Sequence, residues 1–263
     1  MFELQYFWIF WLVQLHIFTT CFSIYIHRSV AHRHFLISKP LGYFFRIVLW
    51  ISGTLGPKWA ETYTSRHRKH HATSDTKNDD QSPHHLTLKQ MCQPWKADQD
   101  EVKKYCPDIQ TPDDWMQKTL HEKYRFAGPW VQHLVAGILF GYLGAVLSLV
   151  LHLLTKNWLG VFIGNYAFHK FGFDYAGHKN LNDKSKNLFP IGILLGGEEL
   201  HNNHHNMPYR PNYRHRWFEV DIGYVYAKIF SMLGLLTISE EKNEQSRKNL
   251  GTSHRASHGR NRS

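Results

Sequence analysis

Cysteine is scarce in this chain of 263 residues. Its three cysteines, Cys21, Cys92 and Cys106, form no C-x-x-C pair. An odd, widely spaced set of this kind offers neither a disulfide framework nor a thiolate zinc site. It fits a reducing compartment, and it means that a metal site in this chain has to be built from other side chains.

Basic residues are absent from the first 26 positions, where Glu3 is the only acidic residue. Residues 5–26 are almost all apolar or aromatic, and about 20 such residues cross the hydrocarbon core of a bilayer. A signal peptide would need a basic segment before this run and an A-x-A-like cleavage site after it, and the sequence has neither. We therefore interpret 5–26 as a membrane span.

A second region, 127–169, contains Lys156 as its only charged residue, if histidine is left aside. It is too long for one crossing and suits a hairpin of two spans, 127–144 and 146–168, with the glycine-containing turn 141–144 at its apex. A third apolar stretch, 40–59, is interrupted by Arg46 and Lys58. It could either span the membrane or lie in its interface as a helix.

Charge is distributed unevenly along the chain. Lys and Arg total 31 against 21 acidic residues, for a net charge of +10, and nearly all of them lie in 27–126 and 170–263. By the positive-inside rule, these two polar regions face the cytoplasm, and the protein is a multi-pass protein of the inner membrane. Because the basic stretches flank membrane segments, we expect no nucleic-acid partner. The polar, basic tail 239–263 is expected to be disordered.

Histidine is the most unusual component, with 20 residues. Eight of these fall into three clusters, HRSVAH at 27–32, HRKHH at 67–71 and HNNHH at 201–205. Residues at i, i+3 and i+4 share one face of a helix, so each H-x-x-H-H trio converges, and so do Asn165 and His169. His27 and His32 diverge by about 140° on an ideal helix, which suits either a helix end or two different metals.

With His169, the clusters supply nine imidazoles, whereas His16, His133 and His152, in or near the spans, are interpreted as packing residues. An all-imidazole set suits Zn, Cu, Fe or Ni. Structural zinc takes four ligands, so nine imidazoles fit two ions that each keep an open position. Two redox metals beside a bilayer suggest oxygen chemistry on a lipid, and the spacing leaves desaturation and hydroxylation both open.

These motifs resemble those of the membrane fatty-acid desaturases, in particular the bacterial members of the stearoyl-CoA (delta-9) desaturase group. HRSVAH, HRKHH and GGEELHNNHH at 196–205 match the three boxes of the family, and NYAFH at 165–169 is similar to its Asn-x-x-x-His element. The resemblance extends from about residue 5 to residue 236. It implies an all-α fold, an integral membrane helical bundle whose cytosolic helical cap carries a histidine-rich diiron site.

In that family all boxes are cytosolic, which places 40–59 in the interface and makes 1–238 one desaturase domain. The metal ligands that the resemblance implies, with Asn165 acting through a water, are His27, His32, His67, His70, His71, Asn165, His169, His201, His204 and His205. Asp75, Asp79, Asp80 and Glu198 match acidic positions near the boxes. The role expected of Glu198 is to orient an imidazole.

The implied reaction uses O2 and two electrons to introduce a cis double bond, at the delta-9 position, into a saturated fatty acyl chain carried by CoA, carrier protein or phospholipid. Membrane lipid and a separate electron donor, such as ferredoxin or a reductase, are the other expected partners. Trp50, Trp59 and Phe168 are candidates for lining the acyl tunnel, although core packing is the favoured role for any one of them. The alternatives are a membrane diiron hydroxylase and a non-enzymatic metal-binding membrane protein.

Overall fold

The computed structural model describes residues 2–93, 98–158, 164–174, 182–188 and 194–239. Almost all of the predicted tail, residues 240–263, lies outside this part of the chain. The described residues are mostly helical, as predicted. The helices and strands, in chain order, are η1 (Leu4–Tyr6), α1 (Phe7–Cys21), η2 (Phe22–Ala31), β1 (Phe35–Ile37), α2 (Lys39–Ile51), α3 (Trp59–Thr73), α4 (Leu88–Met91), α5 (Gln99–Tyr105), η3 (Gln117–Lys123), α6 (Gly128–Trp158), α7 (Phe168–Lys170), α8 (His201–Asn206), α9 (Ile222–Met232) and β2 (Leu236–Ile238).

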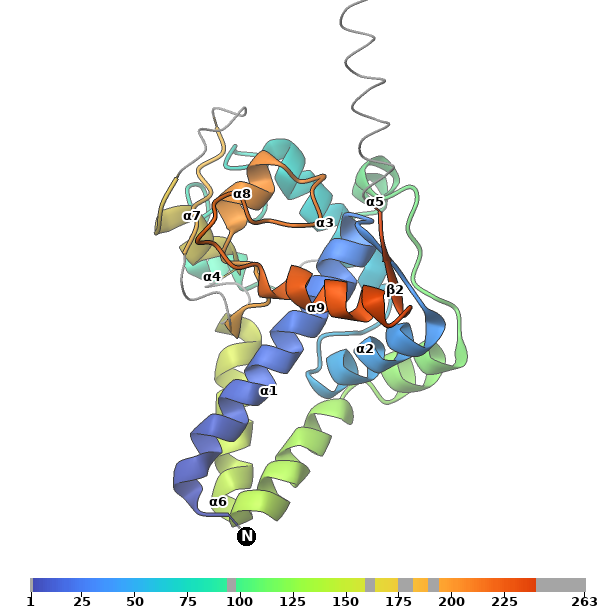
Figure 1. Ribbon diagram of the computed structural model, residues 1–263, viewed down its shortest axis with the longest axis vertical. Coiled ribbons are helices and arrows are strands. Elements are labelled where there is room, and N and C mark those ends of the chain that lie inside the picture. Colours follow the sequence, from blue (N-terminus) through green and yellow to red (C-terminus); the bar gives the residue numbers. More distant parts are fainter. Residues whose placement is uncertain (1, 94–97, 159–163, 175–181, 189–193, 240–263) are drawn as a thin grey trace, which may run out of the picture.

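The lower part of the molecule in Figure 1 is an apolar stalk formed by α1 and α6. Within α6 the chain reverses at Gly141, whose φ of 75° is accessible to glycine at little cost. Hydrogen bonds between Gln132 and His152 and between His133 and Ser148 join the two limbs on either side of this turn. The break therefore lies within the predicted apex 141–144, and the two limbs run antiparallel.

Two helical stretches of the described chain are long and apolar enough to cross a membrane, Leu4–Ala31 and Gly128–Thr155. The second contains the turn at Gly141 and is therefore a hairpin. Many of the apolar side chains on these stretches face outward, including Trp8, Ile9, Leu134 and Ile138, which are more than half exposed. An outward apolar surface of this kind is typical of a membrane-associated stalk.

The predicted interfacial segment 40–59 is shorter as a helix than expected. Helix α2 ends at Ile51, because Gly53 takes a φ of 70° and begins a turn, and α3 begins at Trp59. Helix α2 is amphipathic: Leu41, Phe45 and Leu49 are buried. Its exposed side carries Tyr43, Phe44 and Ile47, apolar groups that suit contact with lipid.

A small antiparallel sheet departs from the predicted all-α fold. Strand β1 pairs with β2 in the register Phe35↔Ile238, Leu36↔Thr237 and Ile37↔Leu236. The sheet joins the segment after the first histidine box to the end of the described chain. Together with the helices around it, it encloses the larger apolar core, which includes Ile24, Phe45 and Trp59. A smaller core of Phe7, Ala136 and Phe140 fills the far end of the stalk.

Candidate metal centre

The nine predicted histidines meet where the stalk joins the upper part of the molecule. His27 lies on η2 and His32 directly follows it, while the H-x-x-H-H trios lie on α3 and α8 and His169 lies on α7. Seven of the nine side chains are buried and two, His32 and His71, are half-buried. Burial of this many imidazoles, which are polar, requires partners within the protein.

The imidazoles form two groups, in each of which the possible ligand nitrogens lie within 4.8 Å of one another. The first histidine group comprises His27, His32, His67, His71 and His204. The second histidine group comprises His70, His169, His201 and His205. Each H-x-x-H-H trio contributes to both groups, because its last two histidines are neighbours in sequence that point to different centres. The two groups are therefore adjacent.

The placement of His27 and His32 follows from an unusual backbone. Segment η2 is a π-helix, with hydrogen bonds between residues five apart, and the amide of His32 donates to the carbonyl of His27 at 3.1 Å. The wider π turn brings residues at i and i+5 to the same side. Both rings therefore enter the first histidine group, as the helix-end alternative allows, rather than separate groups.

The spacing of the nitrogens fits a metal ion and does not fit hydrogen bonds alone. His67 Nε2 lies 2.9, 2.8 and 3.1 Å from the Nε2 atoms of His27, His32 and His71. A ring nitrogen carries one hydrogen or one lone pair, so it cannot bond to three such neighbours. Nitrogens bound at about 2.0–2.1 Å and at right angles around one ion would lie about 3 Å apart. Without a cation, the lone pairs of these nitrogens would repel one another. With a cation between them, each lone pair could bind the metal.

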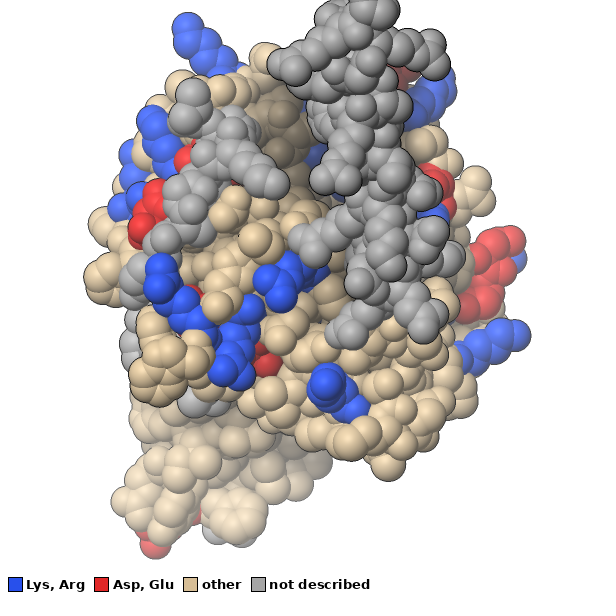
Figure 2. All heavy atoms as spheres, turned by 45° about the horizontal axis from the view of Figure 1, so that its top comes forward, with Lys and Arg blue, Asp and Glu red and all other residues tan. Residues whose placement is uncertain are grey.

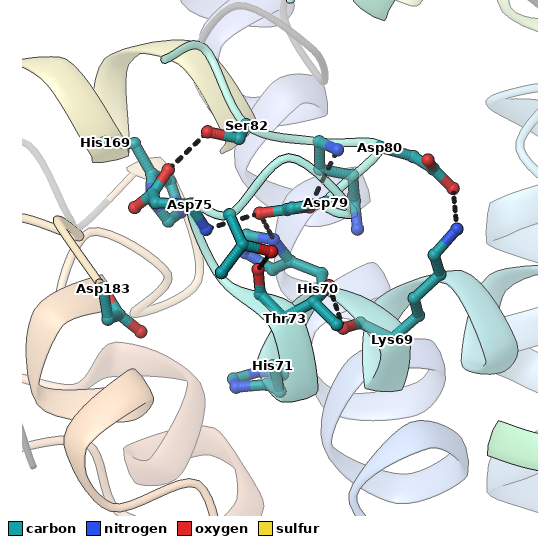
Figure 3. A network of polar contacts seen from close by, with 12 residues as sticks. Lys69, His70, His71, Thr73, Asp75, Asp79, Asp80, Ser82, His169 and Asp183 are labelled. Atoms are coloured by element: carbon teal, nitrogen blue, oxygen red, sulfur yellow. Dashed lines mark hydrogen bonds and ion pairs between the residues drawn. The ribbon is translucent and has the colours of Figure 1, made fainter. Parts of the chain in front are cut away.

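Four carboxylates, three of them buried and Glu198 half-buried, fix the orientation of four of the rings through Nδ1. Glu198 lies 2.6 Å from His27 Nδ1, Asp79 2.9 Å from His70 Nδ1, Asp75 2.8 Å from His169 Nδ1 and Asp183 2.7 Å from His205 Nδ1. A carboxylate accepts the Nδ1 hydrogen, which leaves the Nε2 lone pair free to bind metal. Figure 3 shows Asp79 and Asp75 placed against His70 and His169.

The acidic residues expected near the boxes therefore have different roles. Glu198 orients an imidazole as expected, while Asp80 pairs with Lys69 at 2.6 Å and touches no histidine of either group in the contacts described. Asp183 was missed, since no motif marks it in the sequence. Asp221 was missed as well: it pairs at 2.9 Å with the buried Arg28 and so ties η2 to the start of α9.

Burial sets the protonation state of the imidazoles. It lowers the pKa of His67, His71, His201 and His204 well below 6.5, and the neighbouring imidazoles lower it further. These four rings are therefore neutral at neutral pH, as metal binding requires. Burial raises the pKa of Asp75, but the hydrogen bonds from His169, Ser82 and Lys184 outweigh it and bring that pKa to about 2. Asp75 is thus an anion.

A cavity of about 560 Å³ opens beside the two histidine groups. His27, His67, His70 and His201 line its head, together with Asn165, one helical turn before His169. From there it extends along α1 into the stalk. Of the predicted tunnel residues, Phe168 lines this cavity, whereas Trp50 and Trp59 do not. Trp59 packs in the larger core instead, and Trp50 donates to the carbonyl of Tyr124.

Comparison with known proteins agrees with this geometry. The family model described as fatty acid desaturase matches residues 6–219. The chain is 32% identical over 222 residues to an sn-1 stearoyl-lipid 9-desaturase of Synechocystis sp., covering 80% of this chain and 64% of that relative. It is 31% identical over 232 residues to an sn-1 stearoyl-lipid 9-desaturase of Anabaena variabilis, covering 80% of this chain and 75% of that relative.

A more distant match is an acyl-CoA C20 Delta5-desaturase of Anemone leveillei, 27% identical over 84% of this chain and 72% of the relative. The chain thus spans between about two thirds and three quarters of the length of these relatives. It belongs to the fatty acid desaturase family. This membership supports the predicted resemblance and favours desaturation over the hydroxylase and metal-carrier alternatives.

Proposed function

We propose that the chain is a membrane-bound acyl desaturase that introduces a cis double bond, at the delta-9 position, into a saturated fatty acyl chain. The observation that carries this proposal is the meeting of two imidazole groups at the head of a cavity that extends into an apolar stalk. The two stearoyl-lipid 9-desaturase relatives support the position of the double bond and an acyl-lipid substrate, and the acyl-CoA Delta5-desaturase relative supports an acyl-CoA substrate.

The two histidine groups fit one iron ion each, and Asn165 would act through a water at the same centre. Bound iron would supply the O2 chemistry that breaks two C–H bonds on neighbouring methylenes. In balance, the two hydrogens removed, two electrons from a separate donor such as ferredoxin or a reductase, and two protons convert O2 to two molecules of water. The role of the protein is to hold the ligands and the chain.

Two kinds of residue in this chain perform that role. The four carboxylates at Nδ1 hold each lone pair toward its centre. The apolar part of the cavity wall, including Phe18, Phe22 and Phe168, binds the acyl chain and excludes water. The cavity runs from the imidazoles into the stalk, so a chain lying in it would pass one fixed pair of methylenes beside the metal centre.

Expression in a host unable to make unsaturated lipids tests the reaction. The wild-type chain should restore growth and yield a monounsaturated fatty acid whose double bond maps to the delta-9 position. A hydroxylated product, or iron-loaded protein that leaves the lipids saturated, would contradict the proposal. Separating the phospholipid, CoA and carrier-protein fractions during a short labelling pulse would identify the carrier by where the product first arises.

We further propose that the stalk crosses the inner membrane three times and that the histidine groups face the cytoplasm. Figure 2 supports this arrangement, since Lys and Arg gather on the broad part of the molecule and not on the stalk end seen in that view. The limbs of the hairpin rise about 20 Å and 26 Å. Each limb is shorter than a typical hydrocarbon core of about 30 Å. Whether the hairpin crosses the membrane therefore depends on whether its tip reaches the far side.

Cysteine labelling in intact cells measures that position. In a background where Cys92 is replaced by serine, Tyr142→Cys at the exposed tip should react with a thiol reagent that cannot cross the membrane. Trp217→Cys, equally exposed on the opposite part of the molecule, should react only after permeabilisation. Labelling of Trp217→Cys in intact cells would overturn the orientation, and protection of Tyr142→Cys would show that the hairpin turns back inside the bilayer.

A further inference from the structure

The cavity beside the histidine groups has a polar end. On α1 its lining passes from His27 through the apolar Phe22, Phe18 and Leu15 to Gln14 and Trp11. Gln14 lies about 20 Å along the helix from His27. At the same depth the two limbs of the hairpin contribute Gln132 and His152. A channel suited to an acyl chain thus ends against amide and imidazole groups.

These three side chains are bonded to one another. Gln14 Nε2 donates to Gln132 Oε1 at 2.8 Å, and Gln132 Nε2 donates to His152 Nδ1 at 2.6 Å. They come from α1 and from both limbs of α6, so the network joins all three apolar helical segments of the stalk. Gln132, in the middle, is 6% exposed. Its amide is held at both ends, so moving it aside would leave buried polar groups unpaired.

Packed apolar side chains lie beyond this network. The smaller core, formed by Phe7, Ala136 and Phe140, fills the stalk between the network and the turn at Gly141. Phe140 contacts Phe7 edge to face, with ring centroids 5.6 Å apart. None of these three residues lines the cavity, whose lining extends past the network only to Trp11 on α1 and Ser148 on the second limb. The network therefore lies at the closed end of the cavity, and a chain that enters from the histidines finds little room beyond it.

We infer that the Gln14–Gln132–His152 network is the floor of the acyl site and limits how many carbons can lie beyond the reacting methylenes. The inference rests on the proposed desaturase function. A methyl end that reached the network would have to displace Gln132, breaking both of its hydrogen bonds in an apolar environment. Chains that stop short of the network are accepted, and longer ones are rejected by the lost hydrogen bonds and the lack of space.

Gln132→Ala tests this inference, because it removes the central amide and opens space beneath the chain. The wild-type protein and the variant are expressed in the host without unsaturated lipids, and the cells are fed saturated fatty acids of increasing even chain length. The ratio of long to short monounsaturated products should rise roughly tenfold in the variant. This is the change in discrimination expected when an apolar pocket gains room for one more methylene group. Gln14→Ala should shift the ratio in the same direction.

The matched control is Leu134→Ala, which shortens a side chain on the same limb that is 65% exposed and lines no part of the cavity. It should leave the product ratio unchanged. If Gln132→Ala and Gln14→Ala lower all products equally, the network only holds the helices together and the inference is wrong. If the wild-type chain forms no unsaturated product at all, the proposed function fails instead, so the two failures are distinguishable.

Discussion

Replacing His204 or His201 by alanine should each reduce unsaturated product to the detection limit, although the two residues lie in different histidine groups. Each substitution removes a buried ligand nitrogen from one group and leaves the other intact. Bound iron, measured on purified protein, should fall from about two ions per chain toward one. In the proposed centre both ions would act together, so the double variant should be no less active than either single variant.

The control for this prediction is His215→Ala. His215 is half-buried and belongs to neither histidine group, so the variant should keep its iron and its activity. All variants should be compared at equal amounts of membrane-inserted, monodisperse protein, since a chain that fails to fold would also lose product. Normal product from His204→Ala, or full iron content in both single variants, would show that the assignment of ligands is wrong.

The convergence within each H-x-x-H-H trio could be predicted from the sequence because it depends only on the local helix. Residues three and four apart share a face of any α-helix. The structure does form helices over both trios, and each brings its histidines toward the joint between stalk and cap. The division into two groups could not be predicted, since it depends on which way α3 and α8 face each other across a distance in sequence of more than a hundred residues.

The first box shows where ideal geometry misleads. His27 and His32 diverge on an α-helix, but η2 is a π-helix and brings both rings to one group. A π segment has no reliable composition signal. The turn at Gly141 could be predicted, because a glycine within a long uncharged stretch is a strong local signal.

Long-range partners were the hardest features to predict. Asp183 reaches His205 from a segment without any motif. Trp50 and Trp59 do not line the cavity, although large apolar side chains of this kind would suit an acyl tunnel. Strands β1 and β2 have three residues each, too few to show alternation, and they pair across almost the whole described chain. What each of these residues contacts is decided by tertiary packing rather than by its neighbours in sequence.

Asp75→Asn should lower desaturase activity by about 10- to 100-fold, as expected when a carboxylate that orients a ligand is removed. Asp75 is fully enclosed and accepts hydrogen bonds from His169 Nδ1, Ser82 Oγ and the amide of Lys184, at 2.7–2.8 Å. Since its pKa is about 2, it is an anion at neutral pH. Asparagine has the same shape but removes the charge and one of the two acceptor oxygens.

The physical reason for so large an effect is the tautomer of His169. With its NH2 group toward His169 Nδ1, an asparagine would move the ring hydrogen to Nε2, the atom that lies 3.1 Å from His201 Nε2. The lone pair needed for metal binding would then be lost. Iron should leave the second histidine group of the variant faster in the presence of a chelator, and this measurement does not depend on activity.

Asp80→Asn is the matched control, because Asp80 belongs to the same loop and carries the same charge. Figure 3 shows it pointing away from the histidines toward Lys69, and its side chain is 38% exposed. The loss of such an exposed ion pair costs about 1 kcal/mol or less. Activity and iron retention should therefore stay within about twofold of the wild-type values. If both substitutions had equal effects, the loop would act through its overall charge, and the hydrogen bond to His169 would not be what orients the ligand.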